Sequence, residues 1–365
     1  MSRLRIGVIG CGLIAQVMHL PYLRELTDEF EISALCDVAP DVLEACARDY
    51  NVAGRFTDWH ELLRQELDAV LILTSGSHAP IALAAAERGL HMLVEKPMCF
   101  SVAEGREMIA AAERTGVVLM VGYNKRYDPA YLRMQDEARS LRDARLLRVT
   151  TLESPFQPYV AHYPMHRPAP LPPVLAQSFA ADNTARITAA IGEADALSQR
   201  TYHLVLLDSM VHEFNAVRGL LGEPDSLDFA DIGEHGLNLA LRFGDLRCLI
   251  AWADLPGIAR YSMEFALYAP ERRLTLSFPS PFLRSVPTLL TIEDGEAADA
   301  RSRRTDEIVS YEESFKQELR HFHACVSEGR APVTSAPDAL RDIALSEAVV
   351  AVHRSRKAQR HPTAV

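Results

Sequence analysis

The stretch Gly10-Cys11-Gly12-Leu13-Ile14-Ala15, which follows the apolar run Leu4–Ile9, decides the fold of the first part of the chain. The apolar run predicts a buried strand, and the glycines predict a sharp turn into a helix. Gly10 permits the turn, Gly12 lets the backbone approach a pyrophosphate, and Ala15 is small enough for close packing of helix against strand. The N-terminus of such a helix attracts phosphate charge. The stretch therefore predicts a dinucleotide-binding site.

A carboxylate follows at the position where such a site binds ribose. Asp37 comes directly after a second predicted strand, Phe30–Cys36, and about 20 residues beyond the glycines, as the dinucleotide fingerprint requires. A carboxylate there accepts hydrogen bonds from both ribose hydroxyls and repels a 2′-phosphate. The next residues, Val38-Ala39-Pro40, include no arginine to bind that phosphate. The sequence therefore favours NAD over NADP, and the alternative is a glycine turn in an α/β protein that binds no nucleotide.

Strand and helix patterns alternate through residues 1–122. One predicted helix begins near Pro80, which a first turn tolerates, and ends at Gly89, while Ser101 and Glu104 form a predicted capping box at the start of another. Repeated alternation predicts a doubly wound parallel sheet, so this segment is expected to be a Rossmann domain. The further expected strands are Ala69–Leu73, His91–Val94 and Val117–Val121.

The pattern changes after Gly122. Longer strands flank the turns Phe243-Gly244-Asp245 and Ala269-Pro270-Glu271, which indicates antiparallel pairing, and residues 202–221 have helical spacing. Residues 123–365 are therefore expected to form an α+β domain on a large, open, mainly antiparallel sheet. Residues 155–200, rich first in proline and then in alanine, are interpreted as an insertion or lid ordered by its surroundings. The expected strands are Leu146–Leu152, Leu237–Phe243, Leu246–Trp252, Tyr261–Tyr268 and Arg273–Phe278.

Composition and charge argue against several classes of protein. The 365 residues are enough for two domains, and no apolar run is long enough to span a bilayer. A formal net charge of -11 without a block of Lys or Arg argues against a nucleic-acid partner. Six isolated cysteines fit reduced thiols in a cytoplasmic protein. His162 and His166 have a metal-like spacing, but no acidic or cysteine cluster accompanies them in the sequence, so no metal site is expected.

Two further motifs hold side chains suited to moving a proton. Glu95-Lys96-Pro97 follows a predicted strand, at the sheet edge where α/β proteins bind ligands. A lysine there can be partly desolvated and donate to a hydroxyl oxygen, whereas the alternative is an ordinary surface lysine. Asp208 and His212, four residues apart, share one helical face, and an imidazole can remove a proton from an alcohol. The alternative is a core histidine satisfied by a nearby carboxylate.

Together these motifs are similar to those of a known family. The chain resembles the glucose–fructose oxidoreductase, inositol dehydrogenase and MocA family in the order and spacing of GCGLIA (10–15), Asp37, the loop Thr74–His78, the EKP motif, GYNKRYDP (122–129) and the DxxxH of Asp208 and His212. The resemblance covers nearly the whole chain. It includes Ser314–Phe322 and the C-terminal helix around Ala339–Val352, which in the family returns to the nucleotide domain. It also implies a homodimer or homotetramer.

The resemblance implies roles for individual residues. The catalytic group would be Lys96, Asp208 and His212. The cofactor would be bound by Gly10, Cys11, Gly12, Leu13, Ile14, Asp37, Thr74, Ser75, His78, Glu95, Lys96 and Asn124. The substrate would be bound by Lys96, Arg126, Ser209, His212 and Asn215. Departures from the family pattern lie on the substrate side, where Leu206-Leu207 and Met210 stand at common glycine positions and Asn215 replaces a common aspartate.

The chain is therefore expected to be an NAD-dependent oxidoreductase. It would transfer hydride between the nicotinamide and a secondary hydroxyl or ketone of a sugar, cyclitol or glycoside. His212 would take the hydroxyl proton, Lys96 would donate to the oxygen and Asp208 would orient His212, although His212 and Lys96 can exchange roles. Two alternatives stay open, an NAD-dependent glycosidase that works by transient oxidation and a non-catalytic NAD-binding sensor or regulator.

Overall fold

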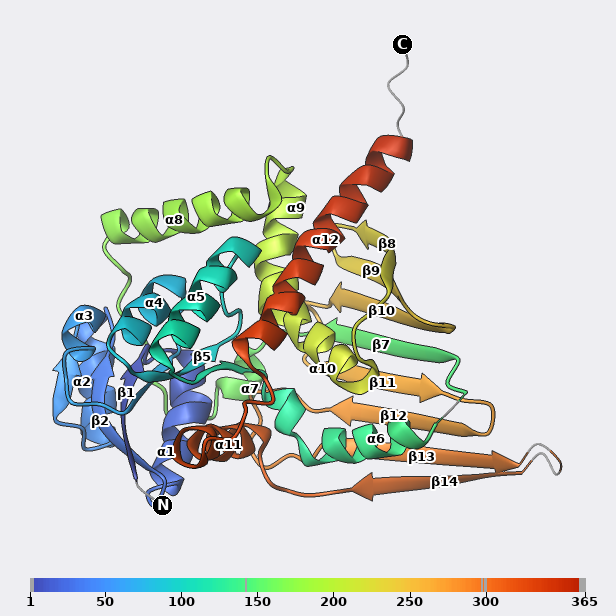
Figure 1. Cartoon of the computed structure of the whole chain (residues 1–365), viewed down its shortest axis with the longest axis horizontal. Helices are drawn as coiled ribbons and strands as arrows, with labels where there is room; N and C mark the ends of the chain where they lie inside the picture. Colours follow the sequence, from blue (N-terminus) through green and yellow to red (C-terminus); the bar gives the residue numbers. More distant parts are fainter. Residues whose placement is uncertain (1–2, 142, 297, 299–300, 361–365) are drawn as a thin grey trace, which may run out of the picture. The chain divides into compact units, whose positions relative to one another are not determined.

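A computed structural model describes residues 3–141, 143–296, 298 and 301–360 (Figure 1). The chain divides into two compact units. The first unit comprises Met1–Asn124, Tyr163–Glu193 and Phe315–Ala344. The second comprises Lys125–His162, Ala194–Ser314 and Leu345–Val365. This division differs from a single boundary after residue 122, because two later segments of the chain pack with the N-terminal part.

The first unit is built on a parallel sheet. Within the described residues its six strands lie in the order β3-β2-β1-β4-β5-β6, and every neighbouring pair is parallel. This confirms the doubly wound parallel sheet. The strands are β1 (Leu4–Ile9), β2 (Phe30–Cys36), β3 (Gly54–Phe56), β4 (Ala69–Ile72), β5 (His91–Glu95) and β6 (Leu119–Gly122).

Helices connect these strands, and α4 and α5 pack side by side (Figure 1). Pro80 lies in the first turn of α4, and the Ser101 hydroxyl accepts a hydrogen bond of 3.2 Å from Glu104 N. The second half of the capping box differs from expectation, because the Glu104 carboxylate accepts from Phe100 N at 2.8 Å. The helices are η1 (a π-helix, Ala15–His19), α1 (Leu20–Glu25), α2 (Pro40–Asp49), α3 (Trp59–Leu62), α4 (Ala79–Glu87), α5 (Val102–Thr115), α8 (Pro173–Ile191) and α11 (Ser314–Glu328).

The second unit is built on a larger, mainly antiparallel sheet. Within the described residues its eight strands lie in the order β14-β13-β12-β11-β7-β10-β9-β8, and β7 and β10 form the one parallel pair. The two predicted turns join β9 to β10 and β11 to β12, both antiparallel. The strands are β7 (Leu146–Glu153), β8 (Ser226–Ile232), β9 (Gly236–Phe243), β10 (Leu246–Asp254), β11 (Ser262–Tyr268), β12 (Arg272–Phe278), β13 (Leu289–Glu296) and β14 (Arg301–Ile308).

The helices of the second unit include a segment wound more widely than the sequence predicts. Residues 202–221, expected as one helix, begin as a π-helix and continue as α10. Helix α6 packs on β12 and β13 and against α10 (Figure 1). In the described part of the chain no helix is long and apolar enough to cross a membrane. The helices are α6 (Pro129–Ser140), α7 (Gln157–Val160), α9 (Ala196–Thr201), η3 (Tyr202–Met210), α10 (Val211–Leu221) and α12 (Ala336–Arg360), which runs on from the first unit.

Candidate functional site

The glycine loop after β1 has the shape of a phosphate cradle. Gly10 has a φ of +99°, and an added Cβ there would lie 2.8 Å from the carbonyl carbon of Leu73. A Cβ added to Gly12 would meet nothing within 4 Å. The first glycine is therefore required by packing, whereas the second leaves open space above the start of a helix. A pyrophosphate fits such a space, because main-chain amides and the helix dipole face it.

Asp37 ties this loop to the next helix. One carboxylate oxygen of Asp37 accepts a hydrogen bond of 2.8 Å from Cys11 N, and the other accepts one of 2.8 Å from Ala39 N. Each oxygen has a second lone pair, so the carboxylate can still accept from ribose hydroxyls. The carboxylate is thereby held in a fixed position between the glycine loop and α2.

The loop after β4, Thr74–His78, is joined to the EKP motif by a buried histidine. The Nε2 atom of His78 lies 2.7 Å from the Thr74 carbonyl oxygen, and its Nδ1 lies 2.8 Å from that of Pro97. Burial lowers the pKa of His78, while hydrogen bonds to the two carbonyls work against that shift. The side chain of His78 thus holds two loops together at the carboxyl edge of the sheet.

The backbone amide of Lys96 forms a hydrogen bond with the buried carboxylate of Glu95. Glu95 accepts a hydrogen bond of 3.1 Å from Lys96 N, and its other oxygen lies 2.7 Å from His19 Nε2. Burial raises the pKa of Glu95, but the hydrogen bond from His19 and the charges of His19 and Lys96 outweigh it and leave that pKa below its usual value. The Lys96–Pro97 peptide bond is cis. The backbone amide of Lys96 is therefore bonded to a carboxylate that His19, from another element, also contacts.

Sequence reasoning missed two buried residues that act on Glu95, namely His19 through a hydrogen bond and Glu318 through its charge. His19 is fully buried at the end of the π-helix, and the ring of Phe315 on α11 lies edge-on to it at 5.5 Å between centroids. Among the described residues, neither carboxylate oxygen of Glu318 has a hydrogen-bond partner, and burial together with the charge of Glu95 raises the pKa of Glu318 well above its usual value. The only sequence signal was a histidine inside an apolar helix.

In the second unit, three of the predicted substrate residues form hydrogen bonds at two separate places. Ser209 accepts a hydrogen bond of 3.2 Å from Trp252 Nε1 and donates one of 3.4 Å to Glu153. Arg126 donates to the side-chain oxygen of Asn215 at 3.0 Å. Ser209 therefore lies beside a carboxylate and an indole, whereas Asn215 is buried and holds Arg126 in place. The sequence offered no signal for Glu153 or Trp252.

His212 is followed by a second carboxylate that was not predicted. Glu213 is fully buried, and Thr151 on β7 donates a hydrogen bond of 2.5 Å to it. Burial raises the pKa of Glu213 to about 7, although the positive charge of Lys125 lowers it in part. Burial also raises the pKa of Glu153. Glu213, next to His212, and Glu153 at the end of β7, which contacts Ser209, are therefore both carboxyl groups with raised proton affinity.

A cavity of about 380 Å³ lies at the ends of β7, β9 and β10. Its wall includes Glu153 and Trp252, the two residues that form hydrogen bonds with Ser209. Its volume is within the range of small-molecule sites. Three carboxylates, those of Glu153, Glu234 and Asp254, can accept from hydroxyl groups, an arginine can donate to them, and an indole offers an apolar face. The polar and aromatic side chains in its wall include Glu153, Arg200, His235, Trp252 and Asp254.

The structure groups the predicted site residues by unit. The first unit holds the glycine loop, Asp37, the loop Thr74–His78, the EKP motif and Asn124, which is buried. The second unit holds Arg126 and the segment from Asp208 to Asn215, with Asp208 in η3 and His212 in the first turn of α10.

Comparison with known proteins bears on both units. Residues 4–123 match the family described as "Oxidoreductase family, NAD-binding Rossmann fold". The myo-inositol 2-dehydrogenase of Thermotoga maritima is 25% identical over 352 residues, which are 92% of this chain and 92% of that protein. The sequence similarity therefore extends through the second unit.

Two solved structures show the same fold. A 3-ketoreductase of Actinomadura kijaniata in complex with NADP has a TM-score of 0.72 at 19% identity, over 96% of this chain and 98% of its own. An oxidoreductase of Agrobacterium radiobacter in complex with NAD+, L-tartaric acid and magnesium has a TM-score of 0.71 at 17% identity, over 97% of each chain. These two relatives hold different nicotinamide dinucleotides, so the fold alone does not select one.

Proposed function

Because the chain belongs to the glucose–fructose oxidoreductase, inositol dehydrogenase and MocA family of oxidoreductases, we propose that it transfers hydride between NAD and a secondary hydroxyl or ketone of a sugar or cyclitol. The observation that carries this proposal is the open space at Gly12 beside the fixed carboxylate of Asp37. A bound nicotinamide would supply the hydride acceptor. Everything else in the reaction has to come from side chains of this chain.

The nucleotide half is assigned to the first unit. The amides of the glycine loop would bind the pyrophosphate, and Asp37 would accept from the hydroxyls of the adenosine ribose. A 2′-phosphate at that position would face the Asp37 carboxylate, which favours NAD over NADP. The loop Thr74–His78 follows β4, the neighbour of β1 in the sheet, so it lies on the same carboxyl edge as the glycine loop.

The proton-transfer group is assigned to Lys96, Asp208 and His212. His212 would take the hydroxyl proton, Lys96 would donate to the same oxygen, and Asp208 would orient His212. Lys96 suits this role because Glu95 fixes its backbone at the carboxyl end of β5. His212 and Lys96 are coupled in this scheme, and the opposite assignment of base and donor gives the same net reaction.

The chemistry of the second unit supports the proposed substrate class. Sugars and cyclitols present many hydroxyl groups on a compact ring with apolar faces. The cavity wall offers Glu153 and Asp254 as acceptors, Arg200 as a donor and Trp252 as a flat apolar surface. The relative that aligns over nearly the whole chain is named for oxidation of myo-inositol, which is a substrate of this kind.

The test is a panel of cyclitols, sugars and glycosides incubated with NAD and, in parallel, with NADP. NADH formation with at least one member, and a clear preference for NAD, is the expected result. The matched variants are Asp37→Ala, which removes the carboxylate, and Asp37→Asn, which keeps an acceptor for Cys11 N but removes the charge. Both are expected to lower the preference for NAD over NADP by about tenfold or more.

Two outcomes of the panel would contradict the proposal. Release of free sugar from a glycoside without net NADH would identify a glycosidase that recycles its cofactor. Tight binding of NAD without turnover on any member would favour a sensor or regulator.

A further inference from the structure

Residues 163–193 form a strap on the first unit, made of an irregular stretch followed by helix α8. This segment is the central part of the predicted insertion 155–200. Within α8 only Ile187 and Ile191 are buried. The helix is therefore attached by few apolar contacts, and its polar contacts determine where it lies.

The first attachment is to the glycine loop. Gln16 and His166 exchange two hydrogen bonds, from His166 N to the Gln16 side-chain oxygen at 2.8 Å and from Gln16 Nε2 to the His166 carbonyl at 3.0 Å. The same Nε2 also donates to the Cys11 carbonyl at 2.7 Å. One side-chain amide thus joins the strap to the loop that is expected to bind pyrophosphate.

The second attachment is to α2, which begins three residues after Asp37. The His166 ring lies 2.6 Å from the carboxylate of Asp49, and Ala169 N donates to Asp41 at 3.1 Å. Asp41 is in the first turn of α2 and Asp49 is its last residue. The strap therefore follows α2 along its length, beside the carboxylate that is expected to bind the ribose.

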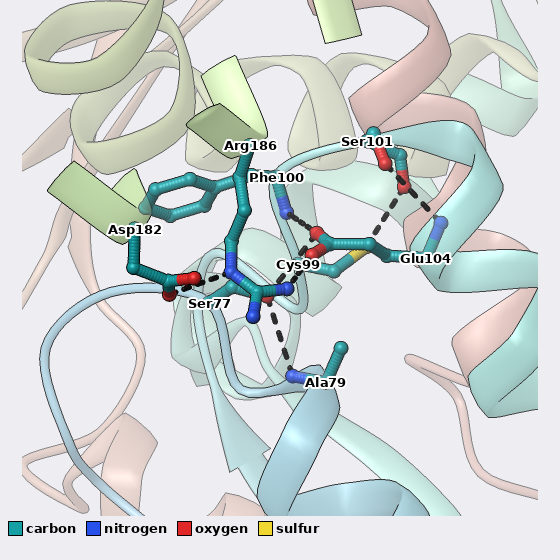
Figure 2. Close-up of polar contacts among 8 residues, drawn as sticks. All are labelled: Ser77, Ala79, Cys99, Phe100, Ser101, Glu104, Asp182 and Arg186. Atoms are coloured by element: carbon teal, nitrogen blue, oxygen red, sulfur yellow. Dashed lines mark hydrogen bonds and ion pairs between the residues drawn. The ribbon is translucent and has the colours of Figure 1, made fainter. Parts of the chain in front are cut away.

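The third attachment is to the loop Thr74–His78 (Figure 2). Arg186 on α8 forms an ion pair with Glu104, and Ser77 donates a hydrogen bond of 3.1 Å to the same carboxylate. Glu104 and Arg186 are partly buried, with 15% and 26% of their side chains exposed. Such a pair is stronger than an exposed one because water screens it less. Glu104 therefore connects the strap to a second cofactor loop.

Close packing supports this third attachment. A Cβ added to Gly76 would lie 3.2 Å from the side-chain oxygen of Asn183 on α8. Gly76 also has a φ of +91°, so both its backbone and its neighbour favour glycine. The strap thus touches the loop Thr74–His78 directly as well as through Glu104.

Each attachment includes a contact near the carboxyl end of a strand. These contacts use Asp41 after β2, the glycine loop after β1, Ser77 after β4 and Glu104 after β5, and these four strands are adjacent in the sheet. In doubly wound folds the dinucleotide lies along this edge. The strap therefore runs along the edge that the proposed function assigns to NAD.

We propose that the strap closes over the bound dinucleotide, and that Arg186 is the positioning residue that keeps it closed by holding the loop Thr74–His78 through Glu104 and Ser77. This inference rests on the proposed dinucleotide site. A dinucleotide that lies beneath the strap can leave only when the strap releases. Weakening the Arg186–Glu104 pair should accelerate exchange of the dinucleotide without altering the proton-transfer residues.

The test compares wild type with Arg186→Ala and Arg186→Lys, using NADH fluorescence to follow equilibrium binding and stopped-flow displacement to follow dissociation. Arg186→Ala is expected to speed dissociation about fivefold, equivalent to about 1 kcal/mol, and Arg186→Lys less. The matched control is Arg114→Ala, which removes an exposed Arg–Glu pair with Glu87 on the same unit and is expected to leave dissociation unchanged.

A second measurement needs no variant. Hydrogen exchange of backbone amides in residues 163–193 of the wild-type protein is expected to slow when NADH is added. Unchanged dissociation in Arg186→Ala, or unchanged exchange in the strap while NADH is bound, overturns this inference and leaves the proposed function intact. Failure of the wild-type protein to bind either NADH or NADPH overturns the proposed function and this inference with it.

Discussion

Thr151 on β7 donates its hydroxyl proton to the carboxylate of Glu213, the residue that follows His212, at 2.5 Å. Both side chains are fully buried. The positive charge of Lys125 lowers the pKa of Glu213 in part, whereas the negative charge of Glu153 raises it further. A carboxyl group that prefers to be neutral therefore lies one residue from the proposed base.

Glu213 should make stability depend on pH. Burial raises its pKa from 4.5 to about 7, so below pH 4.5 the group is protonated in both the folded and unfolded states. As the pH rises from 4.5 to 7, the unfolded chain loses this proton and the folded chain keeps it, so the free energy of unfolding falls. The fall attributable to Glu213 is at most about 3 kcal/mol. Urea denaturation of wild type and Glu213→Gln at pH 5 and pH 8 measures it, and a constant difference between the two proteins would contradict it.

The two glycines of the first loop should respond differently to alanine. Gly12→Ala is expected to leave the thermal midpoint unchanged, because the added methyl meets no atom within 4 Å, yet to weaken NADH binding at least about tenfold by filling the phosphate cradle. Gly10→Ala is expected to destabilise the fold, because its φ of +99° and the nearby Leu73 backbone both exclude a side chain. Equal effects of both variants on NADH binding and on stability would show that Gly12 has no special relation to the dinucleotide.

Lys96→Ala should separate binding from chemistry. Turnover is expected to fall by about a hundredfold to ten-thousandfold, the usual contribution of one proton-transfer group, while NADH affinity changes little. Titration of NADH fluorescence and steady-state rates with the best substrate of the panel measure the two effects. Lys357→Ala, which removes an exposed ion pair with Asp195, is the control. Near-normal turnover in Lys96→Ala would remove this residue from the mechanism.

The buried pair of His19 and Glu95 should matter far more than its exposed counterpart. His19→Phe keeps a ring against Phe315 but leaves Glu95 without the partner that lies at 2.7 Å. Removing one member of a buried ion pair typically costs about 3 kcal/mol or more of folding free energy. The control is His60→Phe, because His60 pairs with Asp58 at the surface over the same distance and its loss should change stability little. Urea denaturation of both variants decides the matter, and similar losses would show that burial does not strengthen the first pair.

The sequence was a good guide where local pattern and structure coincide. β1 and β2 have the predicted bounds, because each is an apolar run closed by a glycine or a charge. β14 was missed because its sequence, RSRRTDEI, has no apolar face. This segment forms a strand through its antiparallel pairing with β13. The short strand β3 offers only three residues of pattern.

The same division applies to the candidate site. Gly10, Gly12 and Asp37 belong to a motif of fixed spacing, so they were predictable. The contacts of Glu95 with His19 and of Glu104 with Arg186 join residues 76 and 82 positions apart. No spacing rule reaches that far, and such contacts depend on how the strands and the strap are laid beside one another. Whether Lys96 and His212 act on one substrate stays a prediction.

The π-helix at Ala15–His19 also restricts how this chain can change in length. Such a turn arises when a single residue is inserted into an α-helix and the extra residue is accommodated as a bulge. If the glycine loop stays in place, deleting Val17 or Met18 would restore ordinary winding and turn His19 by about 100° around the helix axis. The ring would then point away from Glu95. A homologue with such a shortened helix would therefore need another residue to form a hydrogen bond with Glu95, the carboxylate that binds the backbone amide of Lys96.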